Sequence, residues 1–163
     1  MYIMQKDLLS GMKKDFVMQF MDLAVKESHR KGYVLFREGK RANHFFILLK
    51  GCVKISIGET GHTVYTVDHS GEAFGWSSLL GRRDYSASAE CKEPTKLLKI
   101  DAAKLHDLLQ REPAYGLPFF KRLAGTLGHR LLQTYRMIAS APEAEVMTSF
   151  GTGQVMDTES TTA

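Results

Sequence analysis

The spacing of hydrophobic positions changes twice along the chain. Over residues 4–23 apolar side chains recur every three or four positions, which predicts an amphipathic helix or, because Gly11 interrupts the stretch, a broken pair of helices. Over residues 25–100 short apolar runs alternate with glycine-bearing turns, and the segment 53–57 alternates strictly between apolar and polar residues. Five or more short strands in succession predict a sandwich, jelly roll or barrel rather than a parallel α/β sheet.

After residue 100 the helical spacing returns. Asp101 suits the N-cap of one helix, and Pro113 ends that helix. A longer helix is expected from Tyr115 or Leu117 to Ser140, with apolar positions at alternating steps of four and three. The predicted seam of this helix consists of Phe120, Ala124, Leu127, Leu131 and Ile138, with Thr134 as its polar member.

These patterns predict one domain over residues 1–140. It comprises helices at 4–23, a β-roll at 25–100 and helices at 101–140. The remaining residues, 141–163, are rich in Ser, Thr and Gly and carry few apolar anchors. We expect them to form a flexible tail.

Composition agrees with a single soluble domain. The 163 residues are 44% hydrophobic and 25% charged, and the net charge of +4 is interleaved with acids rather than gathered in a patch. No apolar run reaches the roughly 18–20 residues of a membrane span, and the N-terminus lacks a signal pattern. Cys52 and Cys91 match no metal motif, so we expect reduced, packed thiols in a cytoplasmic protein.

A series of short motifs carries a family resemblance over roughly residues 5–138. In this order and spacing, the motifs resemble those of the cyclic-nucleotide-binding domain family, the sensor domains of catabolite-activator-type regulators, of cyclic-nucleotide-dependent kinases and of certain channels. The resemblance implies a mainly β fold with flanking α-helices: an eight-stranded antiparallel β-roll or jelly roll between N-terminal and C-terminal helices. The motifs are Gly32, Phe36-Arg37-Glu38-Gly39, Phe46-Ile47-Leu48, Gly51, Val53, Gly71-Glu72, Phe74-Gly75, Ser86-Ala87-Ser88-Ala89 and Ile100-Asp101.

The stretch GEAFGWSSLLGRRDYSASA, residues 71–89, is similar to the ligand cassette of this family. There a short helix turns its N-terminal amides toward the cyclic phosphate, because unpaired N–H groups and the positive end of the helix dipole attract an anion. The resemblance implies that Gly75 lets the backbone approach the ligand. It also implies that Trp76, Ser77 and Ser78 begin the helix.

The cassette departs from the family pattern at two positions. Trp76 stands where a glutamate accepts from the ribose hydroxyl, and Tyr85 stands where an arginine pairs with the phosphate. Losing that arginine removes a charge-assisted hydrogen bond of about 1.5–3 kcal/mol, a factor of about ten to a hundred in affinity. Arg82 or Arg83 could substitute for it, or both could be solvated turn charges. Trp76 could stack on a base or plug the pocket, and Tyr85 could donate one hydrogen bond to an anion.

The long C-terminal helix has two roles in the family, covering the base of the ligand and forming a dimer. Thr134 and Tyr135 are its candidates for the base contact, and residues 117–140 are expected to form a homodimer interface. Alternatively, this helix only packs on the roll. The candidate ligand-binding residues are Gly75, Trp76, Ser77, Ser78, Arg82, Arg83, Tyr85, Ser86, Ala87, Thr134 and Tyr135.

The resemblance implies a non-enzymatic sensor for signal transduction. It would bind a cyclic nucleotide, cAMP or cGMP, or a related small anion in the 75–87 cassette, need no cofactor, and signal through the C-terminal helix. The alternative is a degenerate cyclic-nucleotide-binding fold that acts without ligand as an interaction module for an unidentified protein partner.

Two other functions, a metalloenzyme and a DNA-binding protein, fit the sequence less well. A cupin-type metalloenzyme needs a His-x-His pair, which is absent; His62 and His69 could meet across a hairpin, but each fits an exposed strand or turn better. No nucleophile motif is present, so we expect no catalytic residue and no metal site. The stretch after Ser140 is short and poor in basic residues, so we expect no DNA binding by this chain alone.

Overall fold

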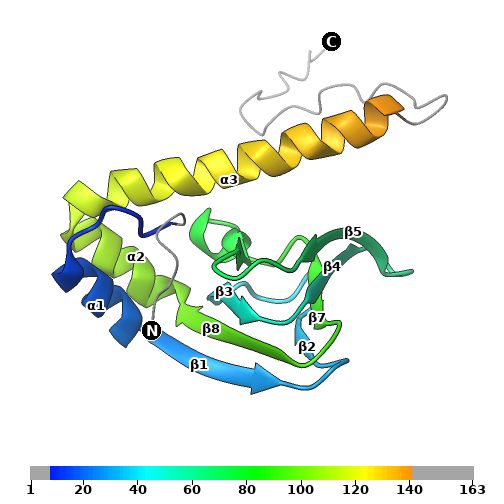
Figure 1. Ribbon diagram of the computed structural model, residues 1–163, viewed down its shortest axis with the longest axis horizontal. Coiled ribbons are helices and arrows are strands. Elements are labelled where there is room, and N and C mark those ends of the chain that lie inside the picture. Colours follow the sequence, from blue (N-terminus) through cyan, green and yellow to red (C-terminus); the bar gives the residue numbers. More distant parts are fainter. Residues whose placement is uncertain (1–7, 141–163) are drawn as a thin grey trace, which may run out of the picture. The chain divides into compact units, whose positions relative to one another are not determined.

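The computed structural model describes residues 8–140. Eight strands and a short 3-10 helix lie between one N-terminal helix and two C-terminal helices (Figure 1). The elements are α1 (Lys14–Asp22), β1 (Ala24–His29), β2 (Val34–Phe36), β3 (His44–Lys50), β4 (Val53–Ile57), β5 (His62–Val67), β6 (Ala73–Phe74), η1 (Trp76–Leu79), β7 (Ser88–Cys91), β8 (Thr95–Asp101), α2 (Ala102–Arg111) and α3 (Pro113–Ser140). This is the predicted mainly β fold with flanking helices.

The described residues fall into two compact units that divide within α3. The first unit ends at Ala124 and carries both sheets, α1 and α2; the second begins at Gly125 and carries the C-terminal part of α3. The prediction of one domain over 1–140 therefore stays a prediction. The expected flexible tail, 141–163, lies outside the described residues.

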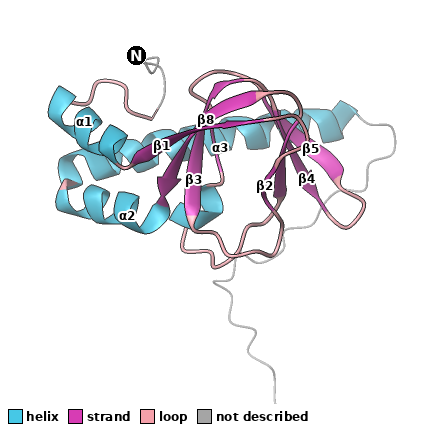
Figure 2. Cartoon of the chain, turned by 90° about the horizontal axis from the view of Figure 1, so that it is seen from below, coloured by secondary structure: helices cyan, strands magenta, loops and turns pink. Residues whose placement is uncertain are grey.

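The strands form two four-stranded antiparallel sheets, in the orders β1-β8-β3-β6 and β2-β7-β4-β5. Figure 2 shows β1, β3 and β8 together on one half of the roll and β2, β4 and β5 on the other. In the first sheet Ile47 of β3 pairs with Leu98 of β8, and in the second Ile55 of β4 pairs with Ala89 of β7. The register sets rows of apolar side chains along both sheets.

Strand β3 is buried on both of its faces. Phe46 belongs to the cluster inside the roll, where its ring lies 5.2 Å from that of Phe74. On the opposite face, Phe45 contacts Phe119 near the start of α3, with ring centroids 6.3 Å apart. The ring of Phe20 in α1 also lies 6.3 Å from Phe119. A run of four buried apolar residues therefore fits a strand between two packed layers, the roll interior and the helices.

The N-terminal helix is shorter than predicted. A turn occupies residues 8–11, where Gly11 has a φ of 69°, and the helix begins only at Lys14. The predicted break at Gly11 is confirmed, whereas helical structure over residues 8–13 is wrong. Residues 4–7 of the predicted helix lie outside the described range.

The C-terminal helices begin and end close to the predicted positions. The amide of Lys104 donates to Oδ1 of Asp101 at 3.0 Å, which confirms Asp101 as the N-cap of α2. Helix α2 ends at Arg111 and α3 starts at Pro113, two residues before the earlier of the predicted starts. Proline suits the first position of a helix, because the amide that it lacks would have no partner there.

The buried face of α3 in the first unit differs from the predicted seam. Gly116, Phe119 and Leu123 are buried, whereas Phe120 is half-buried and Ala124 is exposed. The contacts of Phe119 with Phe20 and Phe45 fix this rotation, which spacing along the chain does not reveal. Among the helices in residues 8–140, none is long and apolar enough to cross a membrane.

The two cysteines are free thiols, as predicted. Cys91 lies buried in β7 and Cys52 is half-buried before β4. Burial raises the pKa of both thiols, which disfavours the reactive thiolate. Their role is therefore packing.

Candidate functional site

The predicted short helix after Gly75 is present as the 3-10 helix η1. Gly75 joins β6 to η1 with a φ of 75°, in the left-handed region. A β-carbon on this residue would lie 2.9 Å from Cδ2 of Phe46 and 3.2 Å from the carbonyl oxygen of His44. Both the backbone conformation and the contact with β3 therefore require glycine here.

The cassette encloses a cavity of about 40 Å³. It brings together six residues that the sequence predicted and three apolar residues that it did not. This volume is far below the range of about 300–1,000 Å³ that is common for small-molecule pockets. The lining consists of Gly75, Trp76, Ser77, Tyr85, Ser86 and Ala87, with Phe36, Ile55 and Phe74.

Tyr85 fills much of the space beside this cavity. Its side chain is only 5% exposed, and its ring stacks on Phe36 with centroids 3.9 Å apart. The hydroxyl donates to the carbonyl oxygen of His44 at 2.8 Å and accepts from the amide of the same residue at 3.1 Å. The Tyr85 hydroxyl, which could have donated to an anion, thus binds the backbone of β3 instead. Burial also raises the pKa of the Tyr85 phenol.

The two arginines of the cassette are exposed. Arg82 and Arg83 lie in the loop after η1, and neither lines the cavity. The backbone of Arg83 is tied down, because its carbonyl accepts from the amide of Ala42 at 2.9 Å. Within residues 8–140, no lysine or arginine side chain lines the 40 Å³ cavity. The charge of an anion in this conformation would meet only hydroxyls and backbone amides.

The serines of the cassette divide into two groups. Ser77 is buried, and its Oγ lies 3.3 Å from Oγ of Ser86 across the cavity. Ser78 instead closes the turn of η1, since its hydroxyl and its amide both donate to the carbonyl of Gly75, at 2.9 and 3.3 Å. Ser77 and Ser86 are therefore the hydroxyls available to a ligand.

The remaining wall of the cavity is aromatic. Phe36, Phe74 and Tyr85 pack with Phe46, and Phe36 lies 5.5 Å from Phe46 and 6.3 Å from Phe74 between ring centroids. Phe36 and Phe74 were not among the predicted ligand-binding residues. Both belong to the motifs that carried the family resemblance, which was the available signal.

Thr134 and Tyr135 lie in the second unit, on the C-terminal part of α3. Both are exposed, and the Thr134 hydroxyl donates to the carbonyl of Arg130 at 3.0 Å. Their predicted contact with the base of a ligand stays a prediction.

A larger open groove lies between η1 and the start of α2. Its volume is about 490 Å³, and its lining includes His44, Ser78, Asp101 and His106. Burial lowers the pKa of His44, which favours the neutral imidazole on this wall. The groove is linked to the cassette by the backbone of His44, to which the Tyr85 hydroxyl binds.

The two histidines that were considered for a metalloenzyme site lie apart. His62 is the first residue of β5 and His69 follows its end, so the two histidines lie at opposite ends of one strand. They do not meet across a hairpin, and both are exposed, as predicted.

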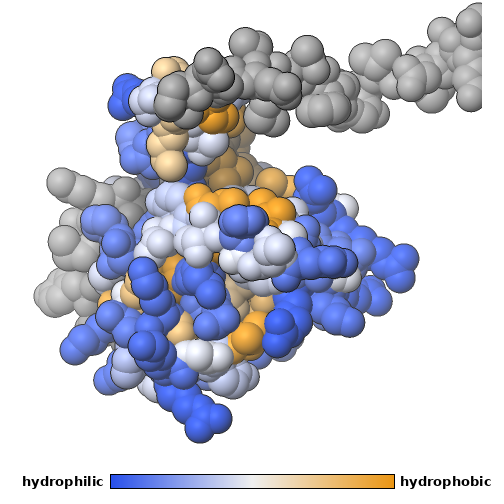
Figure 3. All heavy atoms as spheres, turned by 90° about the vertical axis from the view of Figure 1, so that its right-hand side faces the viewer, coloured by the Kyte–Doolittle hydropathy of each residue, from blue (hydrophilic) through white to orange (hydrophobic). Residues whose placement is uncertain are grey.

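The face of the molecule drawn in Figure 3 is mostly hydrophilic, with hydrophobic residues only in small patches.

Comparison with known proteins gives relatives for the central part of the chain. A family model described as "Cyclic nucleotide-binding domain" matches residues 26–112. An uncharacterized protein of Mycobacterium tuberculosis is 34% identical over 93 residues, which cover 54% of this chain and 18% of that protein. The cGMP-dependent protein kinase 2 of Homo sapiens is 30% identical over 95 residues, covering 56% of this chain and 12% of the kinase. The chain thus spans less than a fifth of these curated relatives.

Solved structures agree on the fold. A cyclic nucleotide-binding domain from Methylobacillus flagellatus superimposes with a TM-score of 0.73 at 22% identity, covering 83% of this chain and 77% of that chain. The match of the family model to more than half of the residues adds the evidence from sequence. The chain belongs to the cyclic nucleotide-binding domain family.

Proposed function

We propose that this chain is a non-enzymatic sensor domain that binds a small ligand in the cassette and signals through its C-terminal helix. The supporting observation is the cavity between Gly75 and Ala87, which six of the predicted cassette residues line. We propose a cyclic nucleotide, cAMP or cGMP, or a related small anion as the ligand, and expect no other cofactor. We expect no DNA binding by this chain alone.

Ligand entry requires the cassette to open. Pockets for small molecules commonly measure about 300–1,000 Å³, far more than the about 40 Å³ present here. Tyr85 is the side chain to move, because its ring takes up the space next to Phe36 and its hydroxyl binds the backbone of His44 at the start of β3. Its departure would free His44 at the start of β3 and leave Ser77, Ser86 and the half-buried Trp76 to contact the ligand.

The missing arginine sets the expected strength of binding. No basic side chain lines the cavity within the described range, so the charge-assisted hydrogen bond of about 1.5–3 kcal/mol is absent unless Arg82 or Arg83 moves inward. We therefore expect cyclic nucleotides to bind about ten to a hundred times more weakly than they would with an arginine at position 85.

We propose that residues 117–140 form a homodimer interface. Leu117, Leu131, Leu132, Tyr135 and Met137 are all exposed on α3, and apolar side chains at these positions favour a partner helix. Sedimentation equilibrium at micromolar concentration tests this directly. A species of twice the 18.3 kDa chain mass supports the interface, and a monomer contradicts it.

A binding experiment tests the sensor function. The thermal stability of the full chain is measured with increasing cAMP or cGMP; a ligand at a hundred times its Kd adds about 2.7 kcal/mol to the free energy of unfolding. Replacement of the cavity-lining Ser77 by Ala should weaken the effect. Ser28→Ala is the matched control, because Ser28 is exposed on β1 and does not line the cavity.

One observation favours a second candidate, a ligand-free protein-interaction module. Tyr85 already occupies the cassette with its hydroxyl fully bonded, so the roll is stable without a ligand. Absence of any stabilisation by either nucleotide, in a protein that melts cooperatively, would support this module and contradict the sensor.

A further inference from the structure

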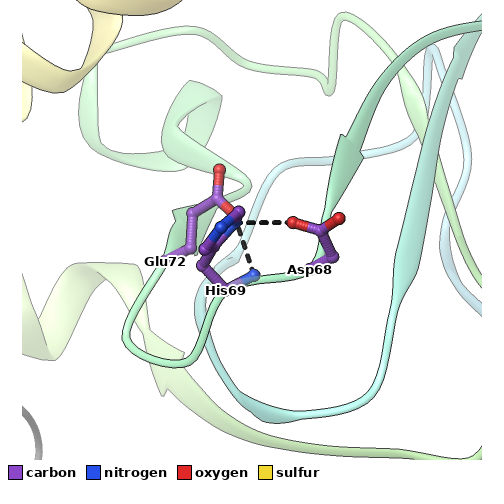
Figure 4. Close-up of side chains that lie close together, drawn as sticks. All are labelled: Asp68, His69 and Glu72. Atoms are coloured by element: carbon purple, nitrogen blue, oxygen red, sulfur yellow. Dashed lines mark hydrogen bonds and ion pairs between the residues drawn. The ribbon is translucent and has the colours of Figure 1, made fainter.

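The turn between β5 and β6 gathers one imidazole and two carboxylates at the surface of the first unit. Asp68 and His69 follow the end of β5, and Glu72 immediately precedes β6. Figure 4 shows the imidazole of His69 between the two carboxylates. Its Nδ1 lies 2.6 Å from Oδ1 of Asp68 and 4.0 Å from Oε2 of Glu72. One ligand atom from each of the three residues lies within 4.8 Å of the others.

Glu72 is held in place by its neighbours. Its side chain is only 13% exposed, and the Tyr65 hydroxyl donates to its Oε1 at 2.6 Å. The amide of His69 donates to the other oxygen, Oε2, at 3.4 Å. The backbone of the turn is fixed as well, because the Glu72 amide donates to the His69 carbonyl at 3.1 Å and the Leu48 amide to the Glu72 carbonyl at 2.9 Å. One carboxylate is thus preorganised with an oxygen directed at His69.

The other two groups are free to adjust. The side chains of Asp68 and His69 are 55% and 86% exposed, so small rotations cost little. Around a tetrahedral metal with bonds of about 2.0–2.2 Å, neighbouring ligand atoms lie about 3.3 Å apart. The measured separations from His69 Nδ1, 2.6 and 4.0 Å, lie on either side of that spacing.

We propose that Asp68, His69 and Glu72 bind a divalent transition-metal cation, for which Zn²⁺ is the best match. An imidazole nitrogen with carboxylate oxygens is a donor set of zinc, whereas Mg²⁺ and Ca²⁺ prefer oxygen ligands alone. Water completes the coordination on the exposed side. The bound cation would take the place of the direct contact between Nδ1 of His69 and Oδ1 of Asp68.

The cation would connect two strands near the cassette. It would join the end of β5 to the residue before β6, and β6 leads directly into Gly75. The site is nevertheless separate from the cassette cavity, since none of the three residues lines it. The inference therefore does not depend on the proposed ligand of the sensor.

The test is a titration of the untagged, metal-free 163-residue chain with ZnCl₂ by isothermal calorimetry. We expect one equivalent to bind, and His69→Ala and Glu72→Gln each to weaken the affinity at least about tenfold. Tyr65→Phe removes the hydroxyl that orients Glu72 and should weaken the zinc affinity by about tenfold. His62→Ala is the matched control: it removes an exposed histidine at the start of β5, outside the proposed site, and should leave the affinity unchanged.

Two results would overturn the proposal. One is the absence of zinc binding by the unaltered chain; the other is unchanged affinity in His69→Ala. Circular dichroism of each metal-free variant checks folding. His69→Ala removes a side chain that is 86% exposed, so it decides the question even if Glu72→Gln, which disturbs the bond to Tyr65, does not fold.

Discussion

The cassette and the turn that leads into it are close in the sequence and opposite in chemistry. The cassette cavity is lined by aromatic, small and hydroxyl side chains, and Arg82 and Arg83 lie outside it. In the turn, Asp68, His69 and Glu72 bring charged groups within a few ångströms of one another at the surface. The glycines and small residues that carry the family resemblance thus determine the backbone path of the cassette. No charged side chain among the described residues lines its cavity.

The substitution at position 85 explains why the cassette is closed. An arginine facing the aromatic cluster would be buried without a partner until an anion arrived, which costs free energy. Tyr85 instead finds both of its hydrogen bonds on the backbone of His44 and stacks on Phe36. We therefore expect Tyr85 to stabilise the unliganded chain and to weaken the binding of an anion. The following variants test these expected effects on stability and on anion affinity.

The largest expected effect concerns Gly75. Gly75→Ala should lower the free energy of unfolding by about 2–4 kcal/mol, from left-handed strain together with the clash against Phe46. Gly81→Ala is the matched control, since Gly81 has a similar φ of 70° but no atom within 4 Å of an added β-carbon. It should cost about 1 kcal/mol. Urea denaturation measures both, and equal losses would refute the packing role of Gly75.

The next effect compares a tyrosine of the cassette with one of the turn. Tyr85→Phe leaves the amide and carbonyl of His44 without their side-chain partner and should cost about 1–3 kcal/mol. Tyr65→Phe removes the bond to Glu72 in the turn and should cost about 0.5–1.5 kcal/mol. If Tyr85→Phe lowers the free energy of unfolding less than Tyr65→Phe does, the hydrogen bonds between Tyr85 and the backbone of His44 contribute less than we propose.

Tyr85 should also make stability fall at alkaline pH. The unfolded chain loses its phenol proton near pH 10, while burial raises the pKa of Tyr85 in the folded chain. The contribution of the Tyr85 phenol to the free energy of unfolding is therefore complete below about pH 10. It is lost as the pH rises through the pKa of Tyr85 in the folded chain. Urea denaturation between pH 9 and 11 should show a shallower decline for Tyr85→Phe. Tyr135→Phe, at an exposed position, should keep the original decline.

The smallest effect is expected for the exposed arginines. The double variant Arg82→Ala with Arg83→Ala should change the free energy of unfolding by less than about 0.5 kcal/mol, because neither side chain is buried. If either arginine contacts a bound anion in the unaltered chain, the double variant should bind nucleotide about ten to a hundred times more weakly. Unchanged affinity in a protein that binds nucleotide would exclude both arginines from the site.

Local patterns predicted most of the fold. A change of spacing was expected at about residue 25, close to the start of β1 at Ala24, although no strand was predicted over residues 24–29. Asp101 and Pro113 mark the limits of α2. The rotation of α3 was not predictable, because it depends on the rings that contact Phe119 from α1 and β3. Periodicity within one helix contains no information about these neighbours.

Six of the eleven candidate ligand-binding residues line the cavity, whose conformation was not predicted. Family motifs identified the residues from Gly75 to Ala87, six of which line the cavity. They did not reveal that Tyr85 turns inward, which depends on the carbonyl and amide of His44. The Asp68, His69 and Glu72 group has no spacing motif. Its proximity results from the path of the turn and from the bond of Glu72 to Tyr65.

Calorimetric titration of the unaltered chain and of Tyr85→Arg with cAMP and cGMP tests the central claim most directly. If the cassette is a nucleotide pocket that Tyr85 closes, the unaltered chain binds weakly and Tyr85→Arg binds about ten to a hundred times more tightly. Tyr85→Phe, which adds no charge, should not reproduce this gain. Absence of binding by the unaltered chain and by a folded Tyr85→Arg variant would contradict the claim.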